Sequence, residues 1–188
     1  MVYSLIILIA SFLLLFLFIG IYNKIIKLKL RVENAWSQID VQLKRRHDLI
    51  PNLVNAVRGY MKYEQETLQK IIDARSKAVR ALETNDLRKI QEAERELGGL
   101  LTRLIALFEN YPELKANENV LKLQEELTHT ENRIAFARQH FNDSVMIYNT
   151  YIQVFPQNII ASIFKFKTFD FFIIEEKDKE VPRVSLEF

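Results

Sequence analysis

The feature that most constrains the fold is an uninterrupted apolar run at the amino terminus. The run Val2–Ile21 holds no charged side chain, and its only polar groups are Ser4, Ser11 and the hydroxyl of Tyr3. As a helix it is about 30 Å long, which matches the hydrocarbon core of a bilayer. A cleaved signal peptide would need a basic stretch before the run and a small-residue cleavage site after it, and neither is present. The sequence therefore predicts an uncleaved transmembrane anchor over residues 1–23.

The charges around this run indicate its orientation. No charged side chain precedes it, whereas cations follow at once, so the positive-inside rule places the amino terminus outside and the carboxyl-terminal domain in the cytoplasm. The lipid bilayer is thus the first expected partner, through residues 2–21. The cations are expected to attract anionic headgroups as well, each contributing about 1 kcal/mol. This membrane-proximal basic set consists of Lys24, Lys27, Lys29 and Arg31.

The rest of the chain has the composition of a charged helical domain. The protein has 26 Lys and Arg against 24 Asp and Glu, a balance that lacks the basic surplus typical of nucleic-acid binders. Four glycines and four prolines are few turn signals for 188 residues, which favours long helices over a β fold. The absence of cysteine excludes disulfides, thiolate metal sites and a cysteine nucleophile. An all-α fold without a nucleic-acid partner is expected.

Apolar residues recur at helical spacing after the anchor and divide into four segments. The turn ETND separates the second segment from the third, with Thr84 or Asn85 as the expected N-cap. Pro112 ends the third segment because the residue before a proline avoids helical backbone angles. The fourth ends before Pro156. The expected helices cover residues 24–47, 49–82, 86–110 and 117–155.

The boundary between the first two segments lies in a dense polar stretch, WSQIDVQLKRRHDLIPNLV, residues 36–54. In one interpretation a single long helix is kinked at Pro51, whose missing N–H frees the carbonyl of His47. In the other the chain reverses in a helical hairpin: the first helix ends near Arg46, and Asp48 caps a second helix whose first turn tolerates proline. In both interpretations, the kink or corner is marked by Arg46, His47, Asp48 and Pro51, and these residues do not form an active site.

Four charged residues occupy seam positions where the helical pattern calls for apolar side chains. Buried ionisable groups must be paired, so two acids and two bases could cross-pair between helices and set their register. Alternatively they sit at the edge of the seam and reach water along their aliphatic stems. The pattern leaves both interpretations open for Glu64, Arg75, Glu131 and Arg138.

Several long motifs follow the single amino-terminal span, in the order WSQIDVQLKRRHDLIPNLV, ENYPELKAN, LQEELTHTENRIAFARQHFND, YNTYIQVFP and VPRVSLEF. These motifs and their order resemble the LemA family, and the resemblance covers nearly the whole chain. Two positions depart from the family pattern: Phe141 stands where the family tends to have tyrosine, and Lys165 stands where it tends to have glycine.

The resemblance implies a protein of the bacterial inner membrane whose soluble part is an up-and-down four-helix bundle. It implies no biochemical activity, because none is established for the family. Some members are encoded near membrane metalloproteases or other small membrane proteins, which makes such a protein an expected partner. A break at residues 46–48 yields four helices of comparable length, so the hairpin is favoured. The expectation is one transmembrane helix followed by an elongated antiparallel four-helix bundle over residues 24–156.

The sequence offers little that could carry catalysis. Glu126 and His129 form the one Glu-x-x-His spacing of the kind that holds di-iron centres in bundles. His129 is rotated about 200° from the core residue Leu127, and no second such motif exists. His47 and Asp48 are neighbours that point apart on a helix, and phosphate loops, nucleophile elbows and zinc-protease motifs are absent. No catalytic residue, cofactor or metal site is therefore expected, and the protein is not predicted to be an enzyme.

The remaining segment, residues 157–188, is rich in phenylalanine. It is expected either to fold back on the bundle or to contact the membrane or a partner, because large exposed apolar patches rarely go unused. The sequence as a whole predicts a membrane-tethered scaffold or interaction module on the cytoplasmic face. The alternative is a self-assembling or membrane-shaping protein, which would form homo-oligomers. The phenylalanines of this segment are Phe164, Phe166, Phe169, Phe171, Phe172 and Phe188.

Overall fold

The computed structural model describes residues 2–172, and within this range the chain is helical without any strand. The all-α class expected from the sequence is therefore confirmed. In chain order the elements are α1 (Val2–Val57), α2 (Gln65–Glu83), α3 (Leu87–Leu107), the short 3-10 helix η1 (Phe108–Asn110), α4 (Pro112–Lys115), α5 (Glu118–Gln153) and α6 (Gln157–Ile163).

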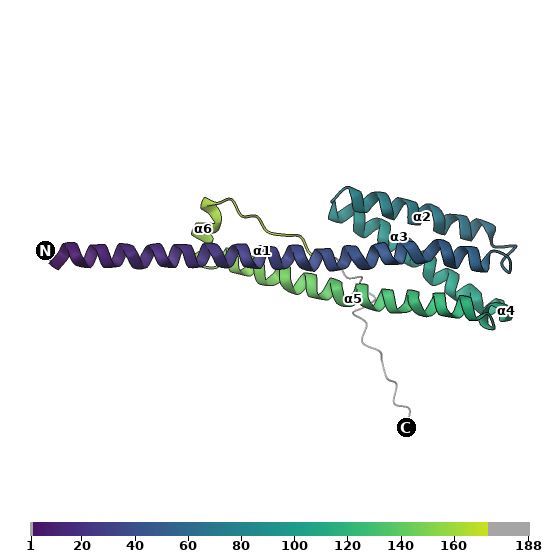
Figure 1. Ribbon diagram of the computed structural model, residues 1–188. Helices are drawn as coiled ribbons and strands as arrows, with labels where there is room; N and C mark the ends of the chain where they lie inside the picture. Colours follow the sequence, from purple (N-terminus) through teal and green to yellow (C-terminus); the bar gives the residue numbers. More distant parts are fainter. Residues whose placement is uncertain (1, 173–188) are drawn as a thin grey trace, which may run out of the picture.

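The helices form a long rod with a shorter hairpin on one end. Figure 1 shows α5 lying side by side with α1, and the hairpin of α2 and α3 packed near the carboxyl end of α1. The amino-terminal part of α1 extends alone beyond the other helices. The four long helices have 56, 19, 21 and 36 residues, so they are not the comparable pieces that the sequence suggested.

The predicted reversal near residues 46–48 is wrong, because α1 is one helix that passes through Pro51 without a break. The chain turns only after Val57, and α2 begins at Gln65. The apolar seam continues across the polar stretch, and Arg46 and His47 of the expected corner are buried, whereas Asp48 is exposed. Acids from other helices pair with Arg46 and His47, which the local sequence does not reveal. The buried seam residues of this part of α1 are Leu43, Ile50, Leu53, Val54 and Val57.

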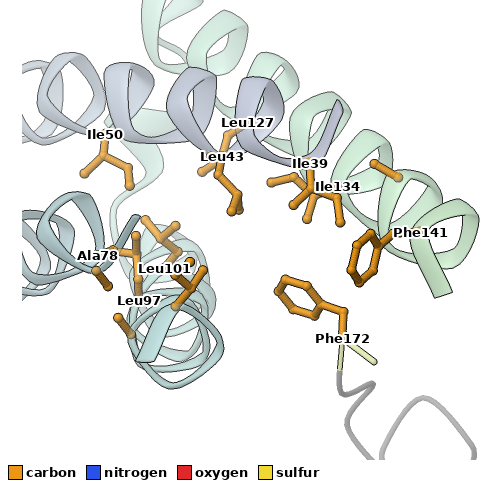
Figure 2. Packing of buried hydrophobic residues seen from close by; sticks show 14 of the residues in the cluster. Ile39, Leu43, Ile50, Ala78, Leu97, Leu101, Leu127, Ile134, Phe141 and Phe172 are labelled. Atoms are coloured by element: carbon orange, nitrogen blue, oxygen red, sulfur yellow. The ribbon is translucent and has the colours of Figure 1, made fainter. Parts of the chain in front are cut away.

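The core is one continuous apolar cluster between the helices. Figure 2 shows Ile39 and Leu43 of α1 facing Leu127 and Ile134 of α5. The hairpin contributes small and branched side chains, among them Ala78, Leu97 and Leu101.

The turns around α3 differ in detail from the sequence expectation. The N-cap of α3 is Asp86, whose carboxylate accepts hydrogen bonds from the backbone N–H groups of Arg88 and Lys89. Asn85 instead adopts a left-handed backbone (φ 52°), which asparagine tolerates better than most residues. The Gly98-Gly99 pair of α3 is not required by a close neighbouring backbone, because a Cβ on either residue would meet nothing within 4 Å.

After α6 an extended segment, residues 165–172, returns along α5, and we call it the strap. Asn149 binds the backbone of Phe169 twice, through Nδ2 to its carbonyl (2.9 Å) and through Oδ1 from its N–H (3.0 Å). Asn142 binds Phe172 in the same two ways, at 2.9 and 2.8 Å. The strap begins at Lys165, whose φ is 57°. Residues 173–188 of the expected tail lie outside the described residues.

The amino-terminal part of α1 has the surface of a membrane span. Every residue from Val2 to Gly20 is exposed, and α1 contains a window long and apolar enough to cross a bilayer.

Candidate functional site

The most concentrated polar chemistry in residues 2–172 is a buried ion network where three helices meet. Arg46 of α1 donates through Nη1 to both carboxylate oxygens of Glu131 on α5, at 2.7 and 3.0 Å. Its Nη2 donates to the carboxylate of Glu94 on α3. The side chains of Arg46 and Glu94 are almost fully buried, whereas that of Glu131 is 41% exposed. One guanidinium group thus links α1, α3 and α5.

His47 joins the same network from the next position of α1. Its Nε2 lies 2.8 Å from Oε1 of Glu94, and the ring is buried. The pKa of His47 is lowered from 6.5 to about 4, mainly by burial and also by the positive charges of Arg46 and Arg75, while Asp40 opposes the shift. At neutral pH the imidazole is therefore uncharged, and Nε2 carries the proton that it donates to Glu94.

Arg75 connects α2 to this centre through the backbone. Its Nε donates to the carbonyl oxygen of His47 at 3.0 Å. In an unbroken helix this carbonyl would accept from residue 51, but Pro51 has no N–H to donate. Arg75 supplies the missing donor and so satisfies the carbonyl that proline leaves free. All four long helices therefore contribute to one network.

The charges of the network balance. With His47 neutral, the cations Arg46 and Arg75 face the anions Glu94 and Glu131, so no net charge is buried. Such networks add little net stability over an apolar core, but removing one member leaves an uncompensated charge and is strongly destabilising. With Arg46, His47 and Glu94 at most 2% exposed, the centre offers no access to a substrate. Its chemistry suits the fixing of helix register and not a reaction.

The residues that the sequence singled out are distributed over several places. Arg75 and Glu131 lie in the network, whereas Arg138 lies over the ring of Phe172, with its guanidinium carbon 4.6 Å from the ring centroid. Glu64 is half-buried at the N-cap position of α2 and makes no side-chain capping bond. Asp48 is exposed on α1 beside the network.

Sequence reasoning missed Glu94. It occupies a seam position of α3, in line with Ile90, Leu97 and Leu101, which are all buried. The signal was the one that identified the other seam charges: an ionisable residue at helical spacing among apolar ones.

The membrane-proximal basic set lies where α5 returns to α1. Lys24 has its Nζ 5.6 Å from the ring centroid of Tyr151 on α5. Lys29 pairs with Glu33 at 3.5 Å, and Lys27 and Arg31 are exposed. These cations follow directly on the apolar span.

Two shallow grooves mark the surface. One, of about 510 Å³, runs between α1 and α5 and contains Val41 and Phe136, which are 60% and 73% exposed. The other, of about 790 Å³, lies between α2 and α3 and is lined mainly by charged side chains, including Lys77 and Glu96, which pair at 2.6 Å. Within residues 2–172, no three His, Asp or Glu side chains are placed to hold a metal ion.

Comparison with known proteins finds relatives over most of the chain. The LemA family model matches residues 35–186. Protein LemA of Metamycoplasma hominis is 29% identical over 148 residues, which cover 78% of this chain and 66% of that protein. Magnetosome protein MamQ of Magnetospirillum gryphiswaldense is 25% identical over 174 residues, with 80% and 64% covered. The chain thus spans just under two thirds of the length of these curated relatives.

Proposed function

The chain belongs to the LemA family, and from this premise we propose that it is a membrane-tethered, non-catalytic scaffold that presents a rigid helical surface on the cytoplasmic face. The observation that carries the proposal is the continuity of α1, which passes from the apolar span into the core of the domain without a hinge. A single unbroken helix couples the orientation of the domain to that of the anchor.

The dimensions of the rod support a presenting role. Residues 22–57 of α1 extend about 54 Å beyond the span, at 1.5 Å per residue, and α5 packs along them. A flexible linker would let the domain sample many heights and directions. A paired-helix rod holds its surfaces at set distances from the bilayer.

The distribution of polar groups favours binding over catalysis. Arg46, His47 and Glu94, at the centre of the ion network, are buried and paired with one another. The groove between α1 and α5 instead exposes the large apolar side chains Val41 and Phe136 in a polar rim. Exposed aromatic anchors with polar surroundings are typical of protein interfaces. We expect the partner, a membrane protein or membrane protease, to bind there.

In-cell photocrosslinking tests the scaffold role. A photoreactive amino acid at Phe136, in the groove, is expected to yield a defined product with one other protein. The matched control is the neighbouring Ala135, which is exposed but does not line the groove. Equal products from both positions, or none from either, would contradict the proposal. A product between two copies of this chain would favour the alternative, a self-assembling protein.

The orientation is tested by labelling with a membrane-impermeant thiol reagent. Because the chain has no cysteine, Val2→Cys and Glu83→Cys each create a single site. With the amino terminus outside and the domain in the cytoplasm, intact cells should label only at position 2. Labelling only at position 83, the exposed last residue of α2, would reverse the assignment.

A further inference from the structure

The segment that joins α5 to the strap carries no charge and projects beside the anchor. We call residues 154–164 the tip; it comprises the turn after α5, the short helix α6 and Phe164. One side of it packs on the core, since Ile160 and Ala161 are 5% and 4% exposed. The other side is open.

The open side of the tip is apolar. Phe155 is 78% exposed and Ile163 62%, more than most large apolar residues outside the span. Water-exposed apolar side chains gathered on one short segment indicate a binding surface, because their hydration is unfavourable. The set consists of Val154, Phe155, Ile159, Ile163 and Phe164.

Contacts with α1 set the height of the tip. The ring of Phe164 lies 4.7 Å from that of Tyr22 and 5.9 Å from that of Phe18, between centroids. Phe18 is on the last turn of the apolar run and Tyr22 follows the run directly, where a span of about 30 Å reaches the boundary between hydrocarbon and headgroups. Figure 1 shows α6 next to α1, on the side of the molecule toward the amino terminus. With α1 in a bilayer, the tip is held at that boundary.

Charge supports lipid as the occupant. Lys165 and Lys167 follow the tip and are exposed, and Lys24 and Lys27 stand on the neighbouring turns of α1. Aromatic and branched apolar residues backed by lysines are the pattern of segments that lie in the membrane interface, with cations at the headgroup level.

We propose that the tip, residues 154–164, inserts into the interfacial layer of the bilayer that holds α1 and forms a second membrane contact. The proposal rests on the anchoring through residues 2–21 described above. A second contact beside the span limits the tilt and rotation of the rod, which one span alone leaves free. The groove between α1 and α5 then faces a defined direction relative to the membrane plane.

Spin-label accessibility in the full chain tests this insertion. Single cysteines replace Phe155 and Phe136, two similarly exposed phenylalanines on one side of the bilayer, about 28 Å apart along the α5 axis by residue spacing. The proteins are reconstituted in bilayer discs of phosphatidylethanolamine and phosphatidylglycerol. The measured quantity is the ratio of collisions with oxygen to collisions with a water-soluble nickel complex. This ratio should be several-fold higher for the label at 155 than for the label at 136.

A third label at Leu13, within the span, distinguishes a tip that does not insert from an anchor that does not span the bilayer. If Leu13→Cys shows lipid-like accessibility and Phe155→Cys matches Phe136→Cys, the tip does not insert, although the anchor stands. If Leu13→Cys is also water-accessible, both the anchoring and the insertion are overturned. Circular dichroism checks that each variant folds, and Ile163→Cys replaces Phe155→Cys if that variant does not.

Discussion

At the scale of single residues, Lys165 holds a backbone conformation that suits glycine. Its φ of 57° lies in the left-handed region, which costs a residue with a Cβ roughly 1–2 kcal/mol. The family resemblance pointed to glycine at this position, and the start of the strap supplies the reason. The chain must turn sharply there from α6 into an extended segment.

Lys165→Gly should therefore stabilise the protein. The relief of backbone strain exceeds the added entropy of the unfolded glycine, for a net gain of about 1 kcal/mol or less. The change is measured as a shift in the denaturant midpoint of the full chain in detergent. Lys167→Gly, at an ordinary backbone position, is the control and should destabilise; a loss of stability in both variants would contradict the explanation.

His47 should make stability depend on pH. The unfolded side chain has a pKa near 6.5 and the folded one about 4, so between these values the unfolded state binds more protons. The contribution of His47 to the free energy of unfolding is therefore complete above pH 6.5. It falls as the pH drops toward 4, by on the order of 3 kcal/mol in total. Asp40 and Arg46 on α1, Arg75 on α2 and Glu94 on α3 face the ring and set the size of the effect.

The measurement is the thermal midpoint of the full chain between pH 4.5 and 7.5. His47→Gln keeps an amide N–H for Glu94 but cannot titrate, so its midpoint should change less over this range. His129→Gln, at an exposed position of α5, should leave the wild-type profile unchanged. A profile for His47→Gln that superimposes on the wild type would show that another group causes the dependence.

At the scale of elements, the strap fits α5 because two spacings agree. Asn142 and Asn149 are seven residues apart on a helix, about 10.5 Å, and their partners Phe169 and Phe172 are three residues apart on an extended chain, about 10 Å. Each asparagine satisfies one N–H and one carbonyl that a strap without a neighbouring strand would leave unpaired. The match therefore holds the strap in a single register.

Asn149→Ala should release the strap from α5. Two backbone groups of Phe169 lose their partners, at a cost of about 1–3 kcal/mol. Hydrogen exchange followed by mass spectrometry should show faster exchange in residues 165–172, with little change in α2 and α3. The matched control Asn119→Ala removes an exposed side chain near the start of α5. Unchanged exchange in the strap would mean that apolar packing alone holds it.

At the scale of the whole molecule, the continuity of α1 sets the distance over which the anchor is coupled to the domain. Spin labels at Ser37 and Asn55, both exposed on α1, should be about 27 Å apart along the axis, at 1.5 Å per residue. The measurement is pulsed electron resonance on the double-cysteine variant in bilayer discs. A reversal near residue 47 would bring the two sites to roughly 10 Å, the spacing of packed helices. A short distance would therefore refute the rod.

The sequence predicted the helical class and the apolar span, and it offered the freed carbonyl of His47 only within the continuous-helix interpretation that it did not favour. It did so because these depend on local properties: side-chain polarity, helical period and the missing N–H of proline. The seam charges Arg75 and Glu131 were also recognisable as residues in need of partners. Their partners were not recognisable, because Arg46 and Glu131 lie 85 residues apart and any nearby acid could have served.

The path of the chain at residues 46–51 shows where local reasoning ends. A run of cations, an aspartate and a proline is compatible with a corner in water or with a buried kink, and the sequence by itself determined only that these residues are special. The tertiary structure decided for the continuous helix, because Glu94, Glu131 and Arg75 arrive from three other helices and lower the cost of burial. The free energy of a buried charge depends on where its counter-charge stands in space, and that position belongs to the fold.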